Sequence, residues 1–270
     1  MAAAALLVLA DAVPAAASPV DVVCASDVRL PPVVTGDLVV RDMCSASASS
    51  IAGDVRVEAG AAADLRAVDV GGDVLVAPRA NVSLHAVDVA GGVRLDDAGY
   101  LGLHGSDVGR SVRGSMRDGW LLGTYVRGAV NLWAHEGTRP TRITFVGART
   151  GGWVNLVRAD VTIRSADLGR GLTLTGVPRG ELCGLKVAAD VTVQRSRGPV
   201  RVGGRTSGAG CEDARPAALM TFGAGLHLLD NRAAVLVQDV HVAGDAVCAG
   251  NAEPARVVGT VDGTRDPRCG

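Results

Sequence analysis

Apolar residues recur along the chain in short groups where every second position is apolar, which is the pattern of a strand with one buried side. One seven-residue pattern is especially regular. It reads Val34-Thr-Gly-Asp-Leu-Val-Val40, Ile51-Ala-Gly-Asp-Val-Arg-Val57, Val70-Gly-Gly-Asp-Val-Leu-Val76 and Val89-Ala-Gly-Gly-Val-Arg-Leu95. Weaker copies are found at Val108, Val126, Thr150, Leu168, Val187, Phe222 and Val242. The chain is therefore an internal repeat of β-strand units.

The third position of the repeat gives its period. It is glycine in most copies: Gly36, Gly53, Gly72, Gly91, Gly128, Gly152 and Gly244. From Gly53 onward, three consecutive intervals are 19 residues long, the last of them ending at Arg110. Each period holds three short apolar segments separated by residues typical of turns, as in Ala77–Asn81. Stacking such units buries apolar faces that no single unit can bury alone.

These features predict an all-β fold, a single-stranded right-handed parallel β-helix with about 18–19 residues per coil and three short strands in each coil. A left-handed helix of hexapeptide repeats is the main alternative, because Val70, Val76 and Val82 keep a six-residue step. The next inward residue is Val89, however, and a period of 19 is not a multiple of six. A β-sandwich is less favoured because it does not require a sequence repeat.

The beginning of the chain is typical of an exported protein. Residues 1–17 are apolar and end in Ala15-Ala16-Ala17, which predicts a secretory signal peptide, although no Lys or Arg follows Met1 and Asp11 interrupts the apolar run. Residues 18–270 then form a single β-helix domain. No later stretch has the ~18 apolar residues that cross a membrane, so we expect a secreted or cell-surface protein.

The six cysteines fall into three pairs that are local in sequence: Cys24 with Cys44, Cys183 with Cys211, and Cys248 with Cys269. An even number in an exported chain favours disulfides, and the absence of a C-x-x-C motif disfavours a zinc or redox site. The sequence leaves the pairing open. We expect the local one, since it brackets the first coil, a long late loop and the C-terminus.

The chain carries 27 basic and 28 acidic residues, a balance that disfavours nucleic-acid binding. The Gly-Asp-Val coils, Gly198–Gly204 and the ending from Val242 to Pro254, with Cys248-Ala-Gly-Asn251, resemble exported repeat proteins of high-GC Gram-positive bacteria, a largely uncharacterised group. More distantly, the repeat is similar to bactofilins, which are polymer-forming β-helical scaffolds. The resemblance implies a parallel β-helix. The chain departs from the first group where Asp replaces the turn Asn and where two coils are longer.

Aligned coils place carboxylates in one column, at Asp69, Asp88, Asp107 and Asp167. Three residues earlier, a basic column contains Arg66, His85, His104 and Arg164. The simplest interpretation is a surface charge ladder with Asp residues capping turns. Asp69, Asp88 and Asp107 are also a candidate calcium site, since stacked carboxylates supply the oxygen ligands that calcium prefers. With a basic residue as the proton acceptor, such a site would suit a polysaccharide lyase.

A second candidate site lies where the repeat is interrupted, after Gly128. Trp133 and Trp153 fall at positions that are polar in other coils, so we expect both to point outward, next to His135, Arg139 and Arg142. Outward indoles beside cations can stack on a sugar or cell-wall glycan. The alternative is that the inserted residues fold back and bury them. Trp120 aligns with Val82 and Leu101 and is expected in the core.

No nucleophile motif or phosphate-binding loop is present, and no catalytic residue is assigned. The first functional hypothesis is a non-enzymatic exported scaffold or surface protein, with self-association through coil ends as one mode of assembly. The second is a module that binds cell-wall glycan or another polysaccharide. The third is a calcium-dependent lyase-like enzyme. Apart from calcium, no cofactor is expected.

Overall fold

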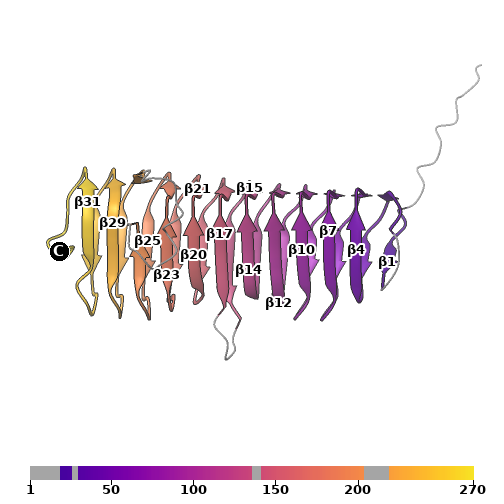
Figure 1. The fold of residues 1–270 in the computed structure, drawn as a ribbon, viewed down its shortest axis with the longest axis horizontal. Helices are drawn as coiled ribbons and strands as arrows, with labels where there is room; N and C mark the ends of the chain where they lie inside the picture. Colours follow the sequence, from indigo (N-terminus) through magenta and orange to yellow (C-terminus); the bar gives the residue numbers. More distant parts are fainter. Residues whose placement is uncertain (1–18, 26–29, 136–140, 204–218) are drawn as a thin grey trace, which may run out of the picture.

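The structure is a computed structural model, and it describes residues 19–25, 30–135, 141–203 and 219–270. These residues form 31 strands and no helix. Each strand pairs in parallel with the equivalent strands of the neighbouring coils, so all 31 strands belong to one hydrogen-bonded sheet that winds around the rod. The strands form about 11 coils. The coils stack along the long axis, with β1 and β31 at opposite ends (Figure 1). The predicted parallel β-solenoid is confirmed.

Three strands per coil generate three faces. Face A contains β1 (Val22–Cys24), β3 (Leu38–Val40), β6 (Val55–Val57), β9 (Val74–Val76), β16 (Val130–Ala134), β19 (Val154–Val157), β22 (Leu172–Thr175), β25 (Val191–Gln194), β28 (Leu226–Leu229) and β30 (Ala246–Ala249). Face B contains β4 (Met43–Ser47), β7 (Ala62–Arg66), β10 (Asn81–His85), β17 (Arg142–Val146), β20 (Asp160–Arg164), β23 (Gly180–Cys183) and β26 (Val200–Val202).

Face C consists of shorter strands. They are β2 (Val33–Val34), β5 (Ser50–Ile51), β8 (Asp69–Val70), β11 (Asp88–Val89), β13 (Asp107–Val108), β15 (Tyr125–Val126), β18 (Arg149–Thr150), β21 (Asp167–Leu168), β24 (Lys186–Val187) and β27 (Met220–Phe222). Four longer strands continue across a corner. β12 (Val93–His104) and β14 (Val112–Leu122) join face A to face B, and β29 (Val235–Val242) and β31 (Arg256–Val261) join face B to face C.

The core runs along the axis and is built from stacked aliphatic residues. Val55, Val74, Val93 and Val112 are consecutive members of one inward column, and all four are fully buried. The repeat produces this arrangement because alternate residues of a strand point to opposite sides. Equivalent inward residues therefore stack from coil to coil at the inter-strand spacing of about 4.8 Å.

Two corners of the coil are turned by a single left-handed residue. Between faces B and C these residues are Ala48, Ala67, Ala86, Gly105, Gly123, Gly147, Ser165, Gly184, Gly203 and Asp239. Between faces A and B they are Gly60, Arg79, Asp97, Arg158, Gly176, Arg195, Asp230 and Gly250. At the third corner, the conserved spacing of the repeat brings backbones together, with the amide of Gly72 donating to the carbonyl of Gly53 at 2.9 Å. The turns thus repeat with the same period as the strands.

Disulfides lie toward both ends of the rod, as predicted. Cys24 bonds to Cys44 in the first coils, and Cys248 bonds to Cys269 at the C-terminus. Cys183 is also disulfide-bonded, and its expected partner Cys211 lies outside the described residues.

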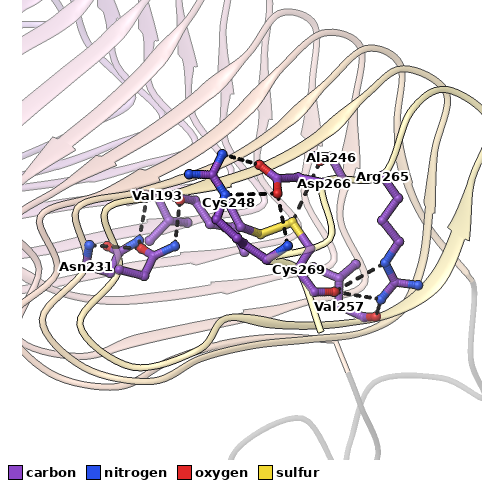
Figure 2. Close-up of a disulfide and its surroundings, with 11 residues drawn as sticks. Val193, Asn231, Ala246, Cys248, Val257, Arg265, Asp266 and Cys269 are labelled. Atoms are coloured by element: carbon purple, nitrogen blue, oxygen red, sulfur yellow. Dashed lines mark hydrogen bonds and ion pairs between the residues drawn. A yellow bond between two sulfur atoms is a disulfide. The ribbon is translucent and has the colours of Figure 1, made fainter.

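Figure 2 shows how the last residues close the C-terminal end. The guanidinium of Arg265 donates to the carbonyl of Cys269 at 3.0 Å and to that of Val257, and the amide of Asp266 donates to the carbonyl of Ala246 at 2.9 Å. Cys269 is 1% exposed. Within the rod, the next coil supplies the hydrogen-bond donors for such backbone carbonyls. At this end the terminal segment supplies them instead.

Candidate functional site

The predicted carboxylate column lies on face C. Asp69, Asp88 and Asp107 are exposed and in direct register on β8, β11 and β13. Their backbone amides pair with the preceding coil, and their carboxylates form a straight row with neighbours about 4.8 Å apart. Among the described residues, no three His, Cys, Asp or Glu side chains converge closely enough to hold a metal ion. The calcium site stays a hypothesis that rests on the row alone.

The basic column lies on face B, across a corner from the carboxylates, and its contacts are with its own face. Arg66 pairs with Asp64 at 2.9 Å. The ring of His85 stacks on that of His104, with centroids 4.5 Å apart and planes 11° from parallel. These contacts stay within face B and do not reach the carboxylate row on face C.

A different set of aspartates joins the coils. The Asp that follows the glycine of the repeat accepts the backbone amide of the equivalent residue in the next coil: Asp37 from Asp54 at 2.7 Å, Asp54 from Asp73 at 2.8 Å, and Asp73 from Gly92 at 2.7 Å. The second oxygen of Asp73 pairs with Arg94 at 2.7 Å. These carboxylates are therefore engaged in coil stacking.

Trp133 and Trp153 both point outward on face A, as predicted, and are 42% and 38% exposed. They do not form one platform. Trp133 is in register with Val157, four residues beyond Trp153 along the chain, which is about 13 Å of extended strand. The indole of Trp153 packs over Gly171 of the next coil, leaving no room there for a side chain. The two indoles lie toward opposite edges of face A.

The polar residues predicted beside the tryptophans are divided between two places. Arg142 begins β17 on face B, in register with Asp118 and Asp160. His135 lies at the corner between faces A and B, where its Nδ1 contacts the Asp97 carboxylate. Arg139 and Glu136 lie outside the described residues. The predicted five-residue cluster is therefore not assembled as a single site in the described part.

The expectation that Trp120 is buried is wrong. Trp120 is 42% exposed and pairs with Gly102 rather than with Leu101, whereas its neighbour Leu121 is fully buried. The cause is a register shift between β12 and β14, where β12 has one additional residue between Leu95 and Ala98. A one-residue slip moves a side chain to the opposite side of a strand.

Around Trp120 the structure places a group of residues that we call the face B cluster: His85, Tyr100, His104 and Trp120. Tyr100 and His104 lie on either side of Gly102 in β12, and their polar ends approach the same point. A Cβ at Gly102 would lie 2.7 Å from the Tyr100 hydroxyl and 3.1 Å from Nε2 of His104. The Oγ of Ser83 lies 2.9 Å from Nε2 of His85. Outward side chains of adjacent strands thus meet on one surface.

Both polar groups over Gly102 favour their neutral forms. Partial burial lowers the pKa of His104, and the neighbouring His85 lowers it further. Partial burial also raises the pKa of Tyr100, with a smaller contribution from the charge of Asp118. At neutral pH the cluster therefore presents a phenol and an uncharged imidazole, which can both donate and accept hydrogen bonds.

A shallow open groove of about 370 Å³ lies on face A, nearer the N-terminal end. Leu75 and Ala77 of one coil line it, together with charged residues of the two flanking coils, among them Arg56 and Arg94. These two arginines pair with Asp37 and Asp73, each at 2.7 Å. The groove runs along one strand and carries charges of both signs.

Comparison of the chain with family models, curated proteins and solved structures finds no match. The resemblance to exported repeat proteins therefore stays a prediction, while the solenoid that it implies is present. A membrane crossing would need a long apolar helix, and the described residues contain none. The disulfides are a feature typical of exported proteins. Chemically, the described surface offers aromatic rings and hydrogen-bonding groups in repeating rows, an arrangement suited to binding.

Proposed function

We propose that the chain is a non-enzymatic scaffold of the cell exterior, a stiff rod that displays binding groups at fixed spacing. One observation carries the proposal: the chain's own C-terminal segment folds against the last coils, held by the Cys248–Cys269 disulfide and by hydrogen bonds to the backbone of Ala246 and Val257. Open strand edges recruit other chains, so an end partly occupied by the chain itself favours a discrete rod over a bactofilin-like polymer.

Two measurements on the purified, oxidised chain test this proposal. Light scattering after size-exclusion chromatography should give the monomer mass, and electron microscopy should show no filaments. Incubation with a panel of polysaccharides, including uronate polymers, should release no shorter products with or without calcium. Filaments growing end to end would contradict the discrete rod. Cleavage that a chelator abolishes would replace the scaffold with the lyase hypothesis.

A second candidate function is glycan binding through face A. It is favoured by the outward indoles of Trp133 and Trp153, because a half-exposed aromatic ring offers a large apolar contact with one polar group. The combined variant Trp133→Ala/Trp153→Ala should lose retention on insoluble cell-wall material, whereas Leu75→Ala, on the same face, should keep it. Equal retention of both variants would remove the two tryptophans from the proposal.

A further inference from the structure

All five tryptophan and tyrosine residues lie in one stretch, from Tyr100 to Trp153, and none of them is buried in the core. Four are at least 38% exposed, and Tyr100 is partly exposed. The two phenylalanines, Phe145 and Phe222, are fully buried. Aromatic residues with a polar group are thus on the exterior of the middle coils, and those without one are inside.

We propose that the face B cluster is a binding site for a neutral glycan chain. The site goes beyond the scaffold role and does not depend on Trp133 or Trp153. Its apolar element is the indole of Trp120, which stands outward between Gly102 of the preceding coil and Thr144 of the next. A pyranose ring presents a flat face of C–H groups that packs on such a ring, and hydroxyl groups at its edge.

The polar element lies directly beside the indole. The hydroxyl of Tyr100 and Nε2 of His104 converge over Gly102, the residue paired with Trp120. Each can donate or accept a hydrogen bond, as the hydroxyls of a sugar require. His85 holds the ring of His104 by stacking at 4.5 Å, and the contact between His85 and Ser83 in turn orients His85. The site is therefore preorganised by the ladder beneath it.

The shape and charge of the surface specify the ligand further. In the middle outward column of face B, Ser83, Gly102, Trp120, Thr144 and Thr162 follow one another in register. Three hydroxyls and one indole, with Gly102 among them, thus extend along the rod, which suits an extended chain better than a single sugar. Nearby charges are balanced, since Asp64 pairs with Arg66 and Asp118 lies in register with Arg142. A balanced surface favours a neutral glycan over a uronate polymer.

The test is affinity gel electrophoresis of the oxidised chain in soluble β-glucan, galactomannan, xylan and glycol chitin. At least one should retard the wild-type chain. Trp120→Ala should weaken binding about tenfold, which corresponds to about 1.4 kcal/mol, because a few central aromatic residues carry most of the binding free energy at such sites. Tyr100→Phe keeps the ring and removes the hydroxyl, and Gly102→Ala displaces the two polar ends while leaving Trp120 in place. Each should weaken binding severalfold. Circular dichroism of every variant checks the fold.

The matched control is Tyr125→Ala, which removes an outward aromatic ring of face C that is 39% exposed and should bind soluble glycan as the wild type does. Three results would overturn the site: no retardation of the wild-type chain by any of the four glycans, wild-type affinity in Trp120→Ala, or loss of binding only in the control. A concentration-dependent dimer that Trp120→Ala disperses would show instead that a second copy of the chain covers this face. That dimer would also change the monomer mass expected of the rod. None of these results bears on end-to-end filaments or polysaccharide cleavage, which decide the scaffold proposal separately.

Discussion

The paired Gly-Asp of the repeat has a direct physical explanation at the scale of single residues. At Gly72, a Cβ would overlap the carboxylate of Asp54 and lie 2.7 Å from the carbonyl oxygen of Gly53. Glycine leaves room for the Asp carboxylate of the preceding coil. Arg110 makes the same backbone hydrogen bond, to the carbonyl of Gly91 at 2.9 Å, where the preceding coil has Gly92 in place of that Asp. Asp73, which follows Gly72, then accepts the amide of Gly92 in the next coil. The two residues form one stacking unit.

This role predicts the effect of removing one carboxylate. Asp73→Ala leaves the amide of Gly92 without its acceptor and Arg94 without its partner, so we expect a loss of about 1–3 kcal/mol in the free energy of unfolding. Asp73→Asn keeps an oxygen acceptor and should lose clearly less. Urea denaturation followed by circular dichroism measures both variants. Equal losses in the two would show that the charge, rather than the amide hydrogen bond, stabilises the stack.

The period of the repeat is visible along the chain, so the sequence predicted which positions carry the repeat glycine and which side chains point inward. It could not reveal the acceptor role of Asp73, whose partner is 19 residues away and is a backbone group. The error at Trp120 has a similar origin. Its side depends on one additional residue in β12, and alternation cannot show in which strand a bulge falls.

At the scale of elements, the corners and the terminal segment determine how coils begin and end. Asp266 and Arg268 stabilise the C-terminal cap seen in Figure 2, with a 2.7 Å ion pair between their side chains. The hydrogen bonds from the side chain and backbone of Arg268 are the main reason that the pKa of Asp266 falls to about 2. The cap thus contains a carboxyl group whose charged form is favoured in the folded chain.

The sign of this shift predicts acid sensitivity at the cap. A lowered pKa in the folded state contributes stability that is fully present above the ordinary aspartate value of about 3.9. That contribution is lost as the pH falls toward about 2. Hydrogen exchange of residues 262–270 should therefore accelerate over this range in the wild-type chain, relative to the middle coils. Asp266→Asn should exchange faster at pH 5 already and show a smaller change on acidification. An unchanged acid response in Asp266→Asn would contradict the assignment.

The positions of the strands were largely predictable from the sequence. The candidate sites were predictable only in part. The alternation that defines each strand also identifies outward residues, so Trp133 and Trp153 were placed correctly. Whether outward residues meet depends on their position along the strand and on the corner between faces. The basic column and the carboxylates of Asp69, Asp88 and Asp107 are three residues apart in sequence and lie on different faces.

At the scale of the whole molecule, the rod is a consequence of the constant period. Each coil adds one strand to every face, so outward residues form straight columns parallel to the axis (Figure 1). A change in composition along the chain therefore stays within a few neighbouring coils, as the aromatic residues between Tyr100 and Trp153 do, and those on one face share one surface. This property makes a solenoid an effective scaffold for an extended ligand.

The central claim, that successive coils stack in this register, is tested most directly by pulsed electron–electron resonance between spin labels on face C. The cysteines in the described part are all disulfide-bonded, so introduced cysteines can be labelled selectively. Ser50 would be labelled together with Tyr125, Asp167 or His241 in turn, which lie four, six and nine coils further along the same column.

At about 4.8 Å per coil, the mean distances should be roughly 19, 29 and 43 Å, rising in proportion to the number of coils. Distances that fail to increase in this order, or that cluster near one value, would contradict the stacked register and with it the surfaces on which the proposed functions depend.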